Sequence, residues 1–270
     1  MPSQSYFYIA LGHAYIDMCV LLVQTLKKQG DTRPVSLLIH PHDEPYARSK
    51  NLFNAFVHFT PSGSIWDDCK TSFEKFCLYP RLYLDAYINQ LPYDEFIITD
   101  TDVLCQYTTE HMWSYFSRQS HNVRMLGNYN DPTWHWGTIN QVSQAYKKHV
   151  PSTHGGFFYL RKSPALSQFF DYAKDVFWNY DNYKCKRWFR DGRVDEIIFA
   201  ITHAHFDMRP LEFDEFPVMT FNYTPDIAIP SNIQTEGDRH RPMRDCIPFV
   251  HMFDKIDGVN FQTLYKTIMG

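Results

Sequence analysis

The chain has 270 residues, with 26 lysines and arginines against 30 aspartates and glutamates and a formal net charge of −4. This balance gives no positive argument for binding nucleic acid through its phosphates, although it does not exclude a local basic groove. Hydrophobic residues make up 44% of the chain and aromatic residues 17%. We therefore expect a well-packed globular protein with aromatic surfaces that can stack on flat ligands.

The composition also bears on the compartment. Residues 1–6 are polar and lack the basic region of a secretory signal. The most apolar early run, residues 18–26, is shorter than the about 20 residues that a membrane helix needs. The six cysteines form no C-x-x-C pair, which argues against a structural zinc site and is typical of a reducing compartment. The sequence predicts a cytoplasmic protein without a membrane span.

Strand and helix signals alternate along the first sixty residues. In chain order we expect a strand at 6–10, a helix at 15–29, a strand at 35–39, a helix at 44–53 and a strand at 56–59. A strand–helix–strand alternation of this kind favours parallel strands joined by crossover helices.

The remaining elements continue this pattern. We expect a helical stretch at 66–90 with a break near Pro80, a strand at 96–99, a loop at 126–141, a strand at 157–160 and a helix at 165–180. Asp195 and Glu196 open a further apolar helix. His203 and His205 could lie on one side of a strand as metal ligands, but two histidines without a third partner are more often structural. The sequence therefore predicts an α/β fold with a mixed, mostly parallel sheet flanked by helices.

Two aspartates end the apolar strand 96–99, in the D-x-D triplet Asp100-Thr101-Asp102. Ligands gather at the carboxyl ends of strands in open α/β sheets. Burying ionised carboxylates costs several kcal/mol unless a cation meets them, and Mg²⁺ and Mn²⁺ prefer carboxylate oxygens. An isolated D-x-D is more often a polar turn, so the triplet alone leaves both readings open.

Trp134, His135 and Trp136 stand together in the expected loop 126–141. Exposed aromatic rings stack on sugars and bases, so this loop is a candidate acceptor site. The other interpretation is that both tryptophans pack inward.

Two further pairs are candidate site residues. Gly155 and Gly156 precede a strand, where glycine permits close approach of the backbone to a ligand or forms a simple bulge. Asp195 and Glu196 lie in the first turn of a helix, which the helix dipole favours without any catalytic role.

Three stretches in chain order resemble the GT-A glycosyltransferase family, in particular its glycogenin and galactinol-synthase branch. They are IALGHAYIDMCVLLVQTLKKQG, then the helix containing Lys75 followed by YDEFIITDTDVL, then THGGFFYLRKSP with VDEIIFA. The resemblance spans roughly residues 6–200. It implies a single Rossmann-like GT-A domain over residues 1–270, with a nucleotide-sugar-binding half at 1–105 and an acceptor-binding half at 106–270.

The resemblance also implies a role for individual residues. The donor-binding residues would be Ala10, Leu11, Gly12, Tyr15, Lys75, Asp100, Thr101, Asp102, Gly155, Gly156 and Lys255. The metal ligands would be Asp100, Asp102 and His251, holding Mn²⁺ or Mg²⁺ against the donor diphosphate. The Gly-x-x-Lys-Pro-Trp tail of that branch is not reproduced around Lys255.

The implied reaction is glycosyl transfer from a nucleotide sugar, in that family branch most often a UDP-sugar, to an acceptor hydroxyl. The acceptor would be a glycan, a protein or a modified nucleic-acid base, and Trp134, His135 and Trp136 would hold it. The glycogenin-like motifs imply retention of the anomeric configuration. Inversion would need a placed general base, and the candidate residues are Asp195, Glu196 and Asp131.

Two other functions stay open. A strand ending in D-x-D-V-L also resembles the first motif of haloacid-dehalogenase-type phosphatases, in which Asp100 would be the nucleophile and Asp102 the acid/base with Mg²⁺. That motif normally lies near the start of its domain, and we find no clear later acidic pair with its lysine. The third option is a catalytically silent module that binds sugar nucleotides.

Overall fold

A six-stranded sheet forms the centre of the molecule. The computed structural model describes residues 3–130, 139–187, 192–212, 215–216, 218–222, 247–252 and 259–270. The strands of the sheet are β1 (Gln4–Ile9), β2 (Val35–Ile39), β3 (Ala55–His58), β4 (Glu95–Thr99), β6 (Val123–Asn128) and β7 (Ser152–Arg161). Their order is β3-β2-β1-β4-β7-β6, and only β7 runs against its neighbours.

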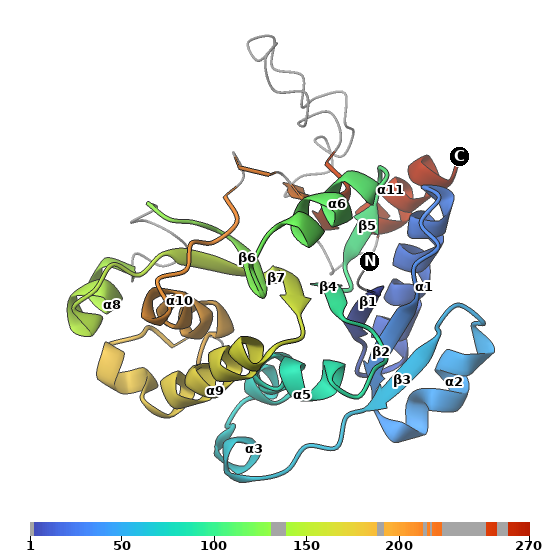
Figure 1. The fold of residues 1–270 in the computed structure, drawn as a ribbon. Coiled ribbons are helices and arrows are strands. Elements are labelled where there is room, and N and C mark those ends of the chain that lie inside the picture. The colour runs from blue at the N-terminus through green and yellow to red at the C-terminus, as the bar shows by residue number, and fades with distance from the viewer. Residues whose placement is uncertain are drawn as a thin grey trace.

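Helices cover both faces of this sheet (Figure 1). The α-helices are α1 (His13–Lys28), α2 (Glu44–Ser49), α3 (Ser64–Asp68), α4 (Tyr79–Leu82), α5 (Leu84–Ile88), α6 (Glu110–Arg118), α8 (Ile139–Tyr146), α9 (Pro164–Trp178), α10 (Asp195–His205) and α11 (Val259–Met269). Two short 3₁₀ turns, η1 (Pro41–Asp43) and η3 (Tyr180–Tyr183), and a π-helical turn, η2 (Glu74–Leu78), complete the helical elements among the described residues.

Alternating side chains of the strands build two cores. Phe96 and Ile98 of β4 point to the face covered by α5, α9 and α10, whereas Ile97 between them points to the face covered by α1 and α6. Successive residues of a strand point to opposite faces, so a strand buried on both faces has to be apolar throughout. The apolar run from Phe96 to Ile98 therefore reflects the position of β4 as a central strand between two helical layers.

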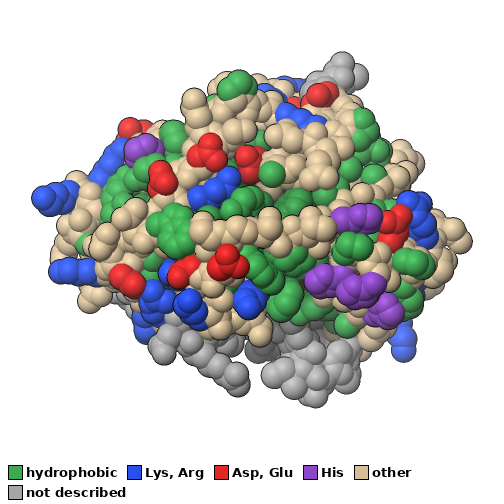
Figure 2. All heavy atoms as spheres, turned by 90° about the horizontal axis from the view of Figure 1, so that it is seen from below, with side chains coloured by type: hydrophobic (Ala, Val, Ile, Leu, Met, Phe, Trp, Pro, Cys, Tyr) green, Lys and Arg blue, Asp and Glu red, His purple; other side chains and the backbone are tan. Residues whose placement is uncertain are grey.

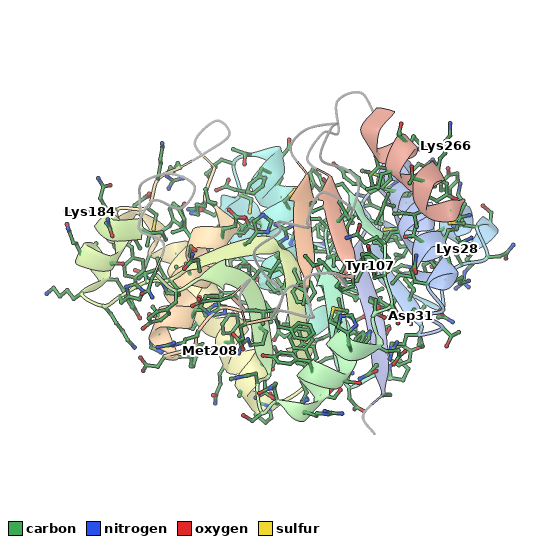
Figure 3. All side chains as sticks on the ribbon, turned by 90° about the horizontal axis from the view of Figure 1, so that it is seen from above. Lys28, Asp31, Tyr107, Lys184, Met208 and Lys266 are labelled. Carbon is green, nitrogen blue, oxygen red and sulfur yellow. The ribbon has the colours of Figure 1, made fainter. Side chains whose placement is uncertain are left out.

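A second, smaller sheet begins with the strand that follows Asp102. It contains β5 (Val103–Cys105), β9 (Phe249–Met252) and β8 (Met219–Asn222), in the order β5-β9-β8. Its residues Leu104 and Val250 pack with Phe261 and Leu264 of α11. Figure 3 shows that α11, marked by Lys266, lies near Lys28 at the end of α1, and the Lys28 ammonium donates to the carbonyl of Met269 over 3.0 Å.

The structure confirms the predicted α/β class and the mixed, mostly parallel sheet. The helix expected at 44–53 ends earlier, at Ser49. The helical stretch 66–90 is divided into α3, η2, α4 and α5, and Pro80 lies at the start of α4, which continues directly from the π-helical turn η2. None of the described helices has the length and apolar character that a membrane crossing requires.

Two local predictions were wrong. The loop expected at 126–141 includes the end of β6 and the start of α8. His203 and His205 do not lie on a strand, because they form the last turn of α10. His203 is buried there with its Nδ1 2.8 Å from the carbonyl of Phe199, and burial lowers the pKa of its imidazole to about 4, so it is a core residue.

Candidate active site

Asp100, Asp102 and His251 converge at the carboxyl end of β4. Asp100 follows β4 directly, and Asp102 precedes β5. Because β5 pairs with β9 so that Val103 faces His251, the histidine comes to lie beside Asp102. Its Nε2 is 3.2 Å from Asp102 Oδ1 and 3.6 Å from Asp100 Oδ2. The predicted metal ligands therefore lie together, although about 150 residues separate the histidine from the D-x-D triplet.

These three side chains fit a divalent cation. Asp102 and His251 are 1% and 3% exposed, and ligand atoms of all three residues lie within 4.8 Å of one another. Two carboxylates suit Mg²⁺ and Mn²⁺, and the imidazole nitrogen favours the softer Mn²⁺. Within the described part of the chain, no other group of three such residues meets this distance.

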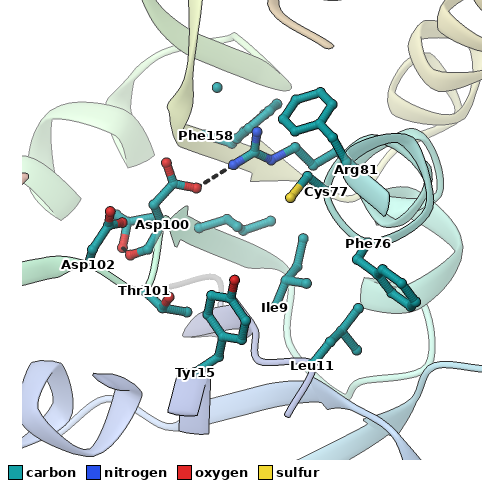
Figure 4. A pocket seen from close by; sticks show the side chains of 14 residues that line it. Ile9, Leu11, Tyr15, Phe76, Cys77, Arg81, Asp100, Thr101, Asp102 and Phe158 are labelled. Atoms are coloured by element: carbon teal, nitrogen blue, oxygen red, sulfur yellow. Dashed lines mark hydrogen bonds and ion pairs between the residues drawn. The ribbon is translucent and has the colours of Figure 1, made fainter. Parts of the chain in front are cut away.

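Arg81 joins this cluster to the start of α10. One guanidinium nitrogen donates to Asp100 Oδ1 and another to Asp195 Oδ2. Figure 4 shows Arg81 reaching from its helix toward Asp100, with Cys77 and Phe76 on the same side of the cavity. Burial disfavours the charged guanidinium, but the two carboxylates outweigh burial and raise the pKa of Arg81. The side chain places a guanidinium charge between two acidic groups.

Gly155 and Gly156 leave the space in which these groups meet. The Asp100 N–H donates to the Gly156 carbonyl over 3.3 Å at the point where β7 pairs with β4. A Cβ atom at position 155 would lie 2.8 Å from both Arg81 Nη1 and Asp195 Oδ2, and one at 156 would lie 2.8 Å from the His154 ring. The glycines therefore serve close side-chain packing around the site.

Glu196, the residue after Asp195, lies beside Arg81 and its two carboxylate partners. Its Oε1 accepts a hydrogen bond from the Gly155 N–H over 3.2 Å, and its backbone carbonyl accepts one from the Thr153 hydroxyl over 2.6 Å. Burial, followed by the charge of Asp195, raises the pKa of Glu196 well above its ordinary value of 4.5. Glu196 thus lies next to a second acid and 3.8 Å from His154 Nε2, whereas Asp195 has the Arg81 guanidinium beside it.

A cavity of about 220 Å³ opens beside the carboxylates. The segment after β1 forms one wall through Leu11 and Tyr15, and the π-helical turn with its flanking residues forms the facing wall through Phe73, Phe76 and Cys77. Tyr15 and Phe76 are 44% and 42% exposed. The cavity therefore combines an acidic, cation-binding end with exposed aromatic rings (Figure 4), a combination suited to a charged ligand that carries a flat ring.

The predicted donor residues that lie within the described ranges divide into three groups. Those that line the cavity are Leu11, Tyr15, Asp100, Thr101, Asp102 and Gly155. Those that adjoin it in the chain are Ala10, Gly12 and Gly156. Lys75 is not among the lining residues, and its ammonium lies 5.1 Å from the centre of the Trp66 ring.

Several other predicted site residues lie outside the described residues. They are Asp131, Trp134, His135, Trp136 and Lys255. Conversely, sequence reasoning missed Arg81. The available signal was a basic residue four positions after Cys77 within the apolar, aromatic segment 73–87, where a buried charge requires a partner.

Glu196 provides a test of the electrostatics of the site. Because its pKa is raised in the folded chain, the folded state binds this proton more tightly than the unfolded state. The contribution of Glu196 to stability is therefore lost as pH rises from the ordinary carboxyl range through the folded pKa. Glu196→Gln should weaken this dependence and stabilise the fold above that range, since the amide oxygen can still accept from Gly155.

The measurement is urea unfolding of both proteins at acidic and mildly alkaline pH. Glu110→Gln is the control, because the Glu110 side chain is 66% exposed. An identical pH dependence of wild type and Glu196→Gln would contradict the assigned state of Glu196.

No family model and no curated protein matches the sequence. Solved structures, in contrast, match the fold of this chain. The galactosyltransferase LgtC, in complex with donor and acceptor sugar analogues, has a TM-score of 0.61 at 10% identity, over 98% of this chain and 96% of that one. Mouse xyloside xylosyltransferase 1 has a TM-score of 0.56 at 12% identity, over 92% and 97% of the two chains.

A third similar structure is the bifunctional glycosyltransferase WbbM. Its TM-score is 0.58 at 10% identity, over 93% of this chain and 45% of that one. At identities this low the similarity establishes the fold alone. The chain has the fold of the GT-A glycosyltransferases.

Proposed function

We propose that this chain is a metal-dependent glycosyltransferase that moves a sugar from a nucleotide-sugar donor to an acceptor hydroxyl. The observation that carries the proposal is the convergence of Asp100, Asp102 and His251 at the cavity, beside Arg81, in a GT-A fold. A fold alone does not determine a function, so the argument rests on this group of side chains.

The donor diphosphate would lie between the acidic end of the cavity and Arg81. Asp100, Asp102 and His251 would hold Mn²⁺ or Mg²⁺, which when bound supplies positive charge for the leaving diphosphate. Arg81 can turn from its carboxylates toward phosphate oxygens, which a guanidinium binds in bidentate fashion. Tyr15, on the opposite wall, is placed to stack on the base of the nucleotide.

The carboxylates at the start of α10 support a retaining reaction. An inverting transferase needs a general base that can take the acceptor proton. Asp195 is 2% exposed and paired with Arg81, and Glu196 accepts from the Gly155 N–H with its Oε1 3.8 Å from His154 Nε2, so both carboxyl groups are already engaged by protein groups. We therefore propose retention, as in the glycogenin and galactinol-synthase branch, with Asp195 orienting the sugar.

The donor and acceptor are proposed by class. A UDP-sugar is the proposed donor, and the similar structures include a galactosyltransferase and a xylosyltransferase, so a hexose and a pentose are both within the proposal. The acceptor is a glycan, a protein or a modified nucleic-acid base. The five described cysteines carry free thiols, which supports a reducing, cytoplasmic location.

The division into a donor half at 1–105 and an acceptor half at 106–270 is also a proposal, in a modified form. Leu11, Tyr15, Arg81 and Asp100 come from the first half. His251 comes from the second half, yet it would contact the metal that holds the donor. The donor site would thus draw on both halves.

The phosphatase alternative is less well supported. In that interpretation Asp100 would follow the first strand of its domain and act as a free nucleophile. Here Asp100 follows β4, after three earlier strands of the same sheet, and is paired with Arg81.

Asp102→Asn tests the proposal directly. Purified protein with Mn²⁺ and a panel of nucleotide sugars should release nucleoside diphosphate from one donor, and a chelator should stop the release. Asn lacks the anionic oxygen that binds the cation. The variant should therefore release nucleoside diphosphate at least about 100-fold more slowly than wild type.

Asp171→Asn on α9 is the matched control, since the Asp171 side chain is 72% exposed. Unchanged metal-dependent release by Asp102→Asn would refute the proposed metal site. Release of inorganic phosphate from simple phosphomonoesters, with none from any nucleotide sugar, would favour the phosphatase. Metal-dependent donor binding with no release, even when acceptors are supplied, would favour a silent binding module.

Arg81→Lys separates charge from geometry. Lysine keeps the positive charge but cannot bridge two carboxylates or bind a diphosphate with two parallel hydrogen bonds. We expect the KM for the donor to rise about tenfold, with the larger share of the effect on donor binding.

Arg161→Lys is the matched control, because Arg161 pairs with Glu95 at the opposite end of β4. It should lower the thermal stability without raising the donor KM. Equal donor KM values in Arg81→Lys and wild type would exclude Arg81 from donor binding.

A further inference from the structure

A second ion pair connects the two segments that Arg81 and Asp195 connect. Glu74 lies in the π-helical turn η2, seven residues before Arg81, and Arg193 lies two residues before Asp195. Glu74 Oε1 accepts hydrogen bonds from the backbone N–H and from Nη1 of Arg193, each over 3.0 Å. The acid stands on the helical segment in this pair and at the start of α10 in the other, so the two pairs join the same segments with opposite polarity.

The Glu74 carboxylate is engaged on both oxygens. Its Oε2 accepts from the N–H groups of Lys70 over 2.7 Å and Thr71 over 3.1 Å, and the Glu74 N–H donates to Thr71 Oγ1 over 3.1 Å. This reciprocal arrangement is a capping box. Burial acts to raise the pKa of Glu74, but the N–H groups and Arg193 outweigh burial and lower it. Glu74 is therefore held as an anion inside the protein, where it is 0% exposed.

Arg193 is anchored by more than Glu74. Its Nη2 donates to Asp68 Oδ2 over 2.6 Å, and its guanidinium carbon lies 4.1 Å from the centre of the Phe177 ring on α9. The next residue, Val194, donates its N–H to the buried hydroxyl of Tyr180 over 3.0 Å. The backbone that leads into α10 is thus fixed to η2, α9 and η3 before the helix begins.

The two ion pairs differ in their access to ligands. Arg81 and Asp100 line the cavity, whereas neither Glu74 nor Arg193 does, and Arg193 is 9% exposed. Figure 2 shows acidic side chains beside lysine and arginine side chains near the middle of the face seen from below. Charges exposed in this way can exchange their partners for a ligand. A diphosphate in the cavity can therefore draw Arg81 away from its carboxylates, but the Glu74–Arg193 pair is out of its reach.

Asp195 needs a second anchor whenever Arg81 turns toward a ligand. Its side chain is then a buried carboxylate without its ion-pair partner, and such a group tends to move toward water. The hydrogen bonds of the Arg193 and Val194 N–H groups restrain the backbone directly before Asp195 and oppose this movement.

We infer that Glu74 and Arg193 are positioning residues that keep Asp195 at the cavity while Arg81 engages the donor. The inference rests on the proposed glycosyl transfer, in which Arg81 binds the diphosphate and Asp195 orients the sugar. Neither Glu74 nor Arg193 contacts the substrate, because both act through the backbone that enters α10. The buried pair stays closed throughout the reaction, whereas the Arg81 pair opens when the donor binds and closes when the diphosphate leaves.

The kinetics of Arg193→Lys in two backgrounds test the inference. Lysine keeps the charge but cannot bridge Glu74 and Asp68, so kcat for metal-dependent transfer should fall about tenfold with the donor KM unchanged. In Asp195→Asn protein the same substitution should change kcat less than about twofold, because the group that it positions has lost its charge. Asp68→Asn is the milder variant, since the Asp68 side chain is 31% exposed, and it should lower the wild-type kcat about threefold.

Arg161→Lys is the matched control, because it also loosens an ion pair with a fully buried glutamate, Glu95. It should lower the thermal stability and leave kcat per folded molecule unchanged in both backgrounds. An equal fall of kcat for Arg193→Lys in both backgrounds would assign Arg193 a purely structural role and overturn the inference. A rise in the donor KM at unchanged kcat would overturn it as well.

Hydrogen exchange at the start of α10 gives a readout that needs no donor. The Ile198 N–H donates to the Val194 carbonyl over 3.3 Å, and its exchange rate reports whether this turn stays closed. Arg81→Gln, which removes one anchor, should leave the rate within about threefold of wild type, and adding Arg193→Lys should raise it at least about tenfold. Equal rates in Arg81→Gln with and without Arg193→Lys would overturn the inference.

The two experiments separate this inference from the proposed function. If wild-type protein transfers no sugar from any donor, the proposed function fails, whereas the exchange rates still decide whether the Glu74–Arg193 pair holds Asp195 in place. If transfer occurs and Arg193→Lys alters neither kcat nor exchange, the proposed function stands and the inference fails.

Discussion

Arg81 places one cation between two carboxylates that come from distant parts of the chain. Asp100 follows the fourth strand of the sheet and Asp195 begins α10, and the same guanidinium binds both. Leaving either charge unpaired in this partly buried setting would cost several kcal/mol. Arg81 lies on α4, which follows the π-helical turn η2, a feature frequent at functional sites. Gly155 provides the space for the contact between Arg81 and Asp195.

The pairing of strands determines what else reaches this point. Antiparallel pairing of β7 with β4 brings Gly156 against Asp100, and pairing of β9 with β5 brings His251 beside Asp102. Register fixes which residues face each other across a ladder. A slip by one residue in β9 would turn His251 to the other face of its sheet and remove the imidazole from the metal group. The chemistry of the site therefore depends on backbone pairing as much as on the acidic residues.

Much of the sheet could be predicted because its signals are local. The apolar run before Asp100 and the alternation of strands and helices depend on neighbouring residues, and they were interpreted correctly. His251 was found only through a resemblance. Arg81 was missed because its partners are 19 and 114 residues away. The incorrect strand at His203 reflects an apolar, β-branched helix interior, which periodicity alone does not distinguish from a strand.

The two oxygens of Asp100 face different groups. Oδ1 accepts from Arg81, and Oδ2 lies 3.6 Å from His251 Nε2, on the side of the proposed metal. One carboxylate can thus contact a metal ion and a guanidinium at the same time. The two cations then share its negative charge, so each weakens the attraction of the carboxylate for the other. When a diphosphate draws Arg81 away, Asp100 Oδ1 loses its donor and its charge becomes more available to the metal. On the proposed function, binding of the donor would therefore tighten the metal site that helps to hold it, which is the reciprocity that any coupled pair of ligands must obey.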